Sequence, residues 1–148
     1  MRLERLCFLI VTGIATFGAL IHWIAPWVGL DWYRFLTSPQ WVVNSVRQGT
    51  WYAPVGAVVV GALMQACGVF ALSATGLLPR LYLLRTALCF IACLCTVRGL
   101  LIFPLLWMVP KQLTAFDITA SLVWLTAGFC MGLGTLLRWP ALRPPALA

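Results

Sequence analysis

Four long runs of apolar residues dominate this chain and constrain its fold more than any other feature. Three uncharged runs cover residues 6–30, 48–79 and 118–137, and a fourth, residues 86–110, carries Arg98 as its single charge. At 1.5 Å per residue, each run can cross a hydrocarbon core of roughly 30 Å as a helix. Charged residues make up only 9% of the chain, far below the content of a soluble domain. The sequence therefore predicts an all-α membrane protein, with four transmembrane helices in an antiparallel bundle.

The chain is predicted to form a single domain, residues 1–148. Helix-breaking residues indicate where its helices end. Pro26 is expected to end the first helix, and Gly76 with Pro79 the second. The connection that follows is short, so the second and third helices are predicted to be antiparallel neighbours. The expected helices cover residues 6–25, 52–78, 81–106 and 115–138, with a flexible Pro-rich tail over residues 140–148.

The segment between the first two helices is rich in aromatic residues, which prefer the headgroup region of a membrane. Ser38-Pro39 resembles an N-cap followed by a first helical proline, and Gly49 resembles a stop signal. These signals predict a short interfacial helix over residues 39–48. Its buried side is expected to comprise Trp41, Val42 and Val46.

Basic residues lie at the ends of the runs rather than in one patch, which does not favour a nucleic-acid partner. One predicted side carries Arg2, Arg5, Arg80, Arg85, Arg138 and Arg143, and the other carries Arg34, Arg47 and Lys111. The positive-inside rule then predicts a bacterial inner-membrane protein with both termini in the cytoplasm.

Small residues recur at helix-packing intervals in two of the runs. Ala53, Ala57 and Gly61 are spaced by four, and Gln65 continues their face and can hydrogen-bond across the contact. Gly128 and Gly132 form a second small-xxx-small pair in the last run. Close helix packing is expected at both places.

Arg98 is the best indication of a site, because a cation inside a spanning helix costs at least ~2.5 kcal/mol. One interpretation is structural: Arg98 bonds carbonyls or Asp117, or extends toward the outer surface. The other is functional: its planar guanidinium binds a lipid phosphate or a carboxylate through two parallel hydrogen bonds.

Further polar and aromatic residues are expected in the same outer half of the membrane. Together with Arg98 the candidate ligand-binding residues are His22, Gln65, Asp117, Asp31, Trp23 and Trp32. Two of them have a simpler structural interpretation. His22 is typical of a hydrogen-bonded packing residue, and Asp117 of a capping box with Thr114. No catalytic set of residues is present, and no cofactor is indicated.

The six cysteines all lie inside predicted spans. Their simplest role is as small apolar packing residues. Cys89 and Cys93 share a helical face, so they are weak candidates for a soft metal site. The C-x-x-C spacing of a thiol carrier is absent.

Several short motifs together resemble a group of small bacterial four-helix inner-membrane proteins. They are His22-Trp23, Asp31-Trp32-Tyr33, the segment 49–54 (GTWYAP) and Arg98-Gly99-Leu100. The architecture is also similar, more distantly, to that of DoxX-like proteins. The group has no assigned activity, so the resemblance implies a fold and a membrane but no chemistry.

Three functions fit these observations. The first is a non-enzymatic protein that binds membrane lipid or a small amphiphile around Arg98. The second is an accessory subunit of a larger membrane complex, or a homo-oligomer, which uses the small-residue faces. The third is a redox or Cu(I)-handling protein that uses the cysteines.

Overall fold

The computed structural model describes residues 2–142, and that part of the chain consists of helices and their connections. Four helical segments are long and apolar enough to cross a membrane. They are α1 (Leu3–Val28), α4 (Tyr52–Thr75), α5 (Leu84–Leu100) continued by α6 (Ile102–Met108), and α7 (Ala115–Leu137). Shorter elements connect them: α2 (Leu30–Phe35), α3 (Gln40–Arg47) and the 3-10 turn η1 (Pro110–Gln112). The protein is a multi-pass integral membrane protein, as the sequence predicts.

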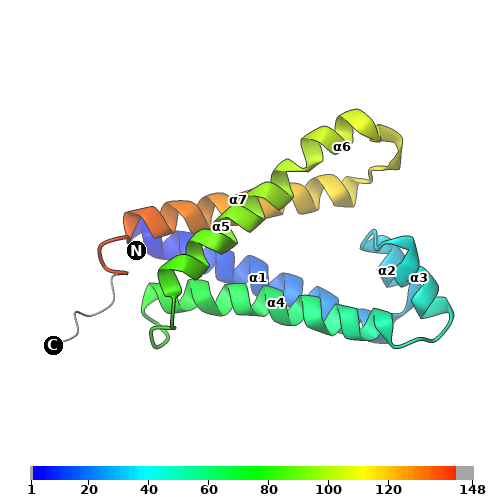
Figure 1. Cartoon of the computed structure of the whole chain (residues 1–148), viewed down its shortest axis with the longest axis horizontal. Helices are drawn as coiled ribbons and strands as arrows, with labels where there is room; N and C mark the ends of the chain where they lie inside the picture. The colour runs from blue at the N-terminus through cyan, green and yellow to red at the C-terminus, as the bar shows by residue number, and fades with distance from the viewer. Residues whose placement is uncertain (1, 143–148) are drawn as a thin grey trace.

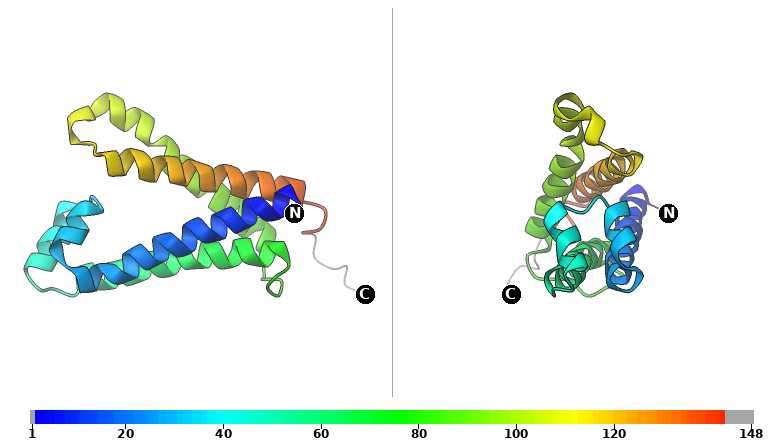
Figure 2. Two further views of the ribbon diagram at one scale, coloured as in Figure 1. Left: turned by 180° about the vertical axis from the view of Figure 1, so that it is seen from behind. Right: turned by 90° about the vertical axis from the view of Figure 1, so that its right-hand side faces the viewer.

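The four spans form two antiparallel hairpins, α1 with α4 and α5–α6 with α7 (Figure 1). The hairpins meet through α1 and α7 at the end where the chain begins, and they separate toward α2, α3 and α6 (Figure 2). The prediction that the second and third spans pack as neighbours is wrong. Far fewer contacts join α4 to α5 than join the members of either hairpin. A short connection brings two helix ends together, but it does not set the angle between the helices.

The small residues of α4 allow close helix packing, as predicted, and the partner is α1. Ala53, Ala57 and Gly61 are all buried on α4. A Cβ placed on Gly61 would meet the Trp23 ring at 2.4 Å, and one on Gly68 would lie 3.2 Å from the Ala15 Cβ. Backbone approach of this kind increases van der Waals attraction, which is the main force between helices in lipid.

The second hairpin uses the same principle. A Cβ on Gly128 of α7 would lie 2.7 Å from the backbone nitrogen of Thr96 on α5, so only glycine fits without movement. Gly132 is one turn further along, where a Cβ would meet the Ala92 Cβ at an ordinary 3.9 Å. The predicted small-xxx-small contact is confirmed, and its tightest point is Gly128.

Two prolines lie inside helices that were predicted to end near them. Pro26 lies within α1, which ends at Gly29 instead, where a φ of 93° takes the backbone out of the helix. Pro104 lies in α6 and has no N–H to donate to the Leu100 carbonyl, so the helical hydrogen bonding is interrupted around Leu101. The third span therefore runs to Met108 with a break, rather than ending at residue 106.

The short helices α2 and α3 pack against the far ends of α1 and α4. Tyr33 of α2 is buried with Ala25, Ala53 and Ala57, and Val42 and Val46 of α3 pack on this cluster as predicted. Trp41, predicted to be buried, is 65% exposed. The predicted Ser38 cap is also wrong, because Pro39 is the N-cap residue of α3 and the cap makes no side-chain hydrogen bond.

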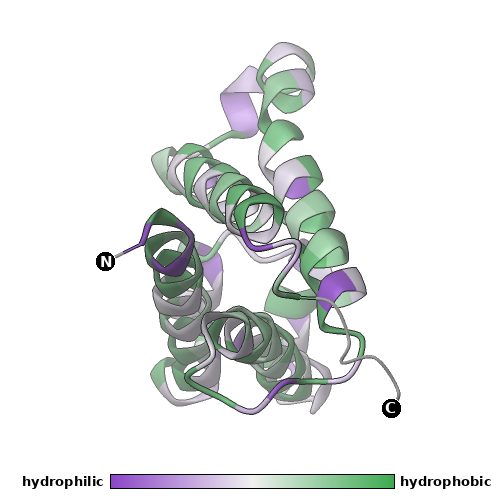
Figure 3. Cartoon of the chain, turned by 90° about the vertical axis from the view of Figure 1, so that its left-hand side faces the viewer, coloured by the Kyte–Doolittle hydropathy of each residue, from purple (hydrophilic) through white to green (hydrophobic). Residues whose placement is uncertain are grey.

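The outer faces of the helices are apolar around the molecule (Figure 3). Large exposed side chains such as Phe17, Leu63, Phe90 and Phe129 occur on all four spans. In water this surface would be unfavourable, whereas in a bilayer it contacts acyl chains. The predicted flexible tail lies outside the described residues from residue 143 onward.

Candidate functional site

Arg98 is exposed near the end of α5, beside the place where α5 and α7 approach most closely. A Cβ on the next residue, Gly99, would lie 2.8 Å from the backbone nitrogen of Leu125. Since successive residues of a helix point about 100° apart, Gly99 occupies the α7 contact and Arg98 is turned away from it. Within residues 2–142 the Arg98 guanidinium makes no hydrogen bond or ion pair.

Asp117 lies close enough to Arg98 for electrostatic attraction, but the two side chains form no ion pair. Its carboxylate already accepts hydrogen bonds from the Thr114 backbone N–H at 2.8 Å and the Thr114 hydroxyl at 2.7 Å. The backbone N–H of Asp117 donates in return to Thr114 Oγ1 at 3.2 Å. The predicted capping box is therefore confirmed, and it uses one oxygen of the carboxylate, Oδ2.

The remaining carboxylate oxygen of Asp117 accepts a hydrogen bond from the hydroxyl of Thr37, at 2.8 Å. Thr37 lies just after α2, and nothing in its local sequence indicates this partner in a distant helix. Next to it, the Phe35 and Phe116 rings lie 5.1 Å apart between centroids. These two contacts connect the hairpins at their separated end.

Three of the candidate residues are engaged in packing the first hairpin. His22 donates from Nδ1 to the Gly18 carbonyl at 2.8 Å, within its own helix. Trp23 donates to the Val58 carbonyl of α4 at 3.2 Å, and Trp32 to the Ile21 carbonyl of α1 at 3.1 Å. Each ring N–H thereby has a partner, as buried or half-buried polar atoms require.

Gln65 and Asp31 do not join the Arg98 region either. The expected hydrogen bond of Gln65 across the α1–α4 contact is absent, and Thr12 supplies one instead, to the Gly68 carbonyl at 3.3 Å. Asp31 pairs with Arg34 at 3.1 Å on the surface of α2, a contact worth about 0–1 kcal/mol.

The seven candidate residues are thus divided between the hairpins, and Asp117 lies close enough to Arg98 to interact with it electrostatically. Their separation follows from the outward divergence of the hairpins, which a sequence pattern does not show. An apolar groove of about 340 Å³ lies on the first hairpin, lined by Trp23, Pro26, Trp27, Pro54, Val55, Val58 and Val59. Ligand binding by the seven candidate residues stays a prediction.

The six cysteines differ in exposure, and Cys67 on α4 is intermediate. Cys89 and Cys93 are exposed on α5, whereas Cys7, Cys95 and Cys130 are buried where the hairpins meet. Among the described residues, no three His, Cys, Asp or Glu side chains are grouped so as to hold a metal ion.

Comparison of the chain with protein-family models, curated proteins and solved structures finds no match.

Proposed function

We propose that this protein is a non-enzymatic inner-membrane protein that binds a membrane lipid, or an amphiphile of similar chemistry, through Arg98. The observation that carries the proposal is an exposed guanidinium on a spanning helix that makes no hydrogen bond or ion pair within residues 2–142. A charge in that position needs a counter-charge or water to offset its insertion cost. Asp117 does not supply it through contact, because the two side chains form no ion pair and the Asp117 carboxylate accepts its hydrogen bonds from Thr114 and Thr37.

A lipid phosphate or carboxylate fits the unused hydrogen-bonding capacity of Arg98. The planar guanidinium presents paired donors that match two oxygens of such a group. Exposed apolar side chains adjoin Arg98 along α5, among them Leu94, Val97 and Leu101. Acyl chains can lie along these side chains while the anionic group contacts the arginine.

The proposed orientation places both termini in the cytoplasm. Arg2, Arg5 and Arg138 lie at the end where α1 begins and α7 ends, whereas Arg34, Arg47 and Lys111 lie on the connections at the opposite end. The positive-inside rule favours the first end as cytoplasmic. Arg98, beyond the middle of the third span, then belongs to the outer leaflet.

Native mass spectrometry of the full chain in mild detergent tests this proposal. We expect Arg98→Leu to retain less co-purifying anionic lipid than the unmodified protein. Arg47→Leu removes an exposed cation from α3 and serves as the matched control, with retention unchanged. Equal retention by the unmodified protein and Arg98→Leu, with both folded by circular dichroism, would contradict the proposal.

The accessory-subunit hypothesis loses much of its original support. The small-residue faces that motivated it are used inside the molecule, at Gly61 against Trp23 and at Gly128 against Thr96. A role in a complex or homo-oligomer stays a prediction.

A further inference from the structure

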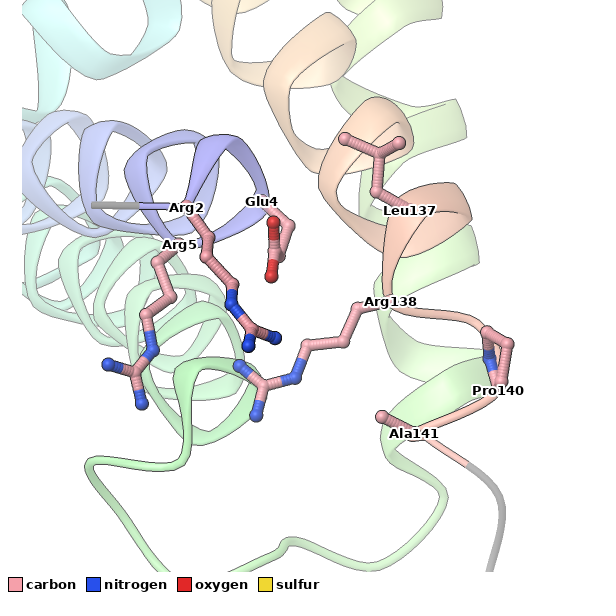
Figure 4. Close-up of a pocket in the computed structure, with 7 residues that line it drawn as sticks. All are labelled: Arg2, Glu4, Arg5, Leu137, Arg138, Pro140 and Ala141. Atoms are coloured by element: carbon pink, nitrogen blue, oxygen red, sulfur yellow. The ribbon is translucent and has the colours of Figure 1, made fainter.

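A cavity of about 810 Å³ opens at the end of the molecule where α1 begins and α7 ends (Figure 4). The connection between α6 and α7, which follows Arg98 in the chain, lies at the opposite end of the spans. Its lining comprises Arg2, Glu4, Arg5, Leu137, Arg138, Pro140 and Ala141. The positive-inside rule explains why cations occur at this end, but not why three of them surround one cavity.

The three arginines of this cavity have unused hydrogen-bonding capacity within residues 2–142. Figure 4 shows the side chains of Arg2 and Arg138 pointing toward one another, with that of Arg5 extending to one side of them. Within residues 2–142 none of their guanidiniums makes a hydrogen bond, and none pairs with Glu4. The three guanidiniums and the carboxylate of Glu4 give the cavity a net positive charge. A bound anion would reduce the repulsion among the guanidiniums.

Two other arginines hold the segment that follows α7 in place beside the cavity. Arg85 stacks on the Trp139 ring with its guanidinium carbon 4.4 Å from the ring centroid, and it donates to the Trp139 carbonyl. Arg80 donates to the carbonyl of Leu142, whose side chain is buried. The segment after α7 is thereby held across the beginning of α5, and this fixes Pro140 and Ala141 beside the open arginines.

We propose that this cavity binds the phosphate group of an anionic phospholipid. A guanidinium binds two phosphate oxygens with paired donors, and three arginines line this cavity, two of which point toward one another. A lipid is favoured over free phosphate because the rim is apolar: Leu137 lines the cavity and is half exposed, and Leu136 beside it is 72% exposed. The cavity lies at a membrane edge, where headgroups contact the protein and basic pockets between spans bind anionic lipids.

Titration of the purified full chain in detergent with phosphatidylglycerol, followed by native mass spectrometry, tests this proposal. Phosphatidylcholine with the same acyl chains and inorganic phosphate are the comparison ligands. We expect phosphatidylglycerol to bind, and Arg138→Gln to weaken its binding about tenfold. Arg138→Lys keeps the charge but loses the paired donors, so it should weaken binding less. Arg47→Gln, which removes a cation at the other end of the spans, should leave binding unchanged.

Running each variant in an Arg98→Leu background separates this site from the one proposed around Arg98. Loss of binding caused by Arg138→Gln in that background supports the cavity alone. Equal binding of phosphatidylglycerol and phosphatidylcholine would overturn the proposal, as would unchanged binding in the folded variant Arg2→Gln/Arg5→Gln/Arg138→Gln. Displacement of phosphatidylglycerol by inorganic phosphate at similar concentration would instead identify a free-phosphate site and overturn the lipid assignment.

Discussion

The hydroxyl of Thr37 donates a hydrogen bond of 2.8 Å to the carboxylate of Asp117, and with the ring contact of Phe35 and Phe116 it joins the two hairpins at their separated end. Thr37 adopts a left-handed backbone conformation, with a φ of 51°, which is uncommon for a β-branched residue. The conformation brings α2 of the first hairpin to the first turn of α7.

Thr37→Ala should loosen this connection while leaving the capping box of α7 intact. The variant removes one hydrogen bond to a charged group, worth about 1.5–3 kcal/mol, less in so exposed a place. We expect faster hydrogen exchange in α2 and in the first turn of α7. Thr119→Ala, which removes a hydroxyl bonded only within α7, is the control. Unchanged exchange in Thr37→Ala would show that the ring contact of Phe35 with Phe116 holds the hairpins by itself.

The existence of the four spans could be predicted because it depends on runs of apolar residues, and lipid imposes few other solutions on such runs. Close packing at the small-residue face of α4 was predictable for a similar reason, since its residues recur at helical spacing, but the pattern did not identify α1 as the partner. The helix ends were less predictable. Pro26 and Pro104 lie inside helices, because a spanning helix tolerates proline where other groups satisfy the freed carbonyl.

The candidate site was predicted only where its determinants are local in sequence. The cap formed by Thr114 and Asp117 spans three residues, so its spacing identifies it. The contact of Thr37 with Asp117 depends on how two hairpins diverge, which has no local signal. The cavity around Arg138 was missed for the same reason: its arginines lie at opposite ends of the chain and were interpreted as topology signals alone.

Gly128→Ala should destabilise the second hairpin, whereas Gly132→Ala should not. The added methyl at residue 128 would lie 2.7 Å from the Thr96 backbone nitrogen, so the helices must move apart, at a cost of about 1–3 kcal/mol. At residue 132 the same methyl finds ordinary contact with Ala92, and the loss of a helical glycine should stabilise by about 0.5–1 kcal/mol. Thermal unfolding in detergent distinguishes the two. Equal melting temperatures would mean that α5 and α7 are farther apart than described.

The cysteines should differ in their reactivity toward a lipid-soluble maleimide. Cys89 and Cys93 are exposed and should be modified first, whereas Cys7, Cys95 and Cys130 are buried where the hairpins meet and should react only after unfolding. Mass spectrometry of digested protein, sampled over time, gives the order. Early modification of the buried set would indicate that the hairpin junction opens readily.

Tyr33 should make the stability of the protein depend on alkaline pH. Its hydroxyl is buried without a hydrogen-bond partner, and burial raises the pKa of the phenol above its ordinary value of 10.0. The unfolded chain therefore ionises at lower pH than the folded chain, so the contribution of Tyr33 to stability is complete below pH 10.0 and is lost as the pH rises beyond it.

Tyr33→Phe should remove this alkaline loss and leave stability at neutral pH equal or slightly higher, because no hydrogen bond is given up. Tyr82→Phe, at a residue 87% exposed, is the matched control and should behave like the unmodified protein. Thermal unfolding in detergent, followed by circular dichroism at neutral pH and above pH 10.0, measures both effects. If Tyr33→Phe lost as much stability at alkaline pH as the unmodified protein, the phenol would have to be ionising in contact with water, and the cluster of Tyr33 with Ala25, Ala53 and Ala57 would be open in solution.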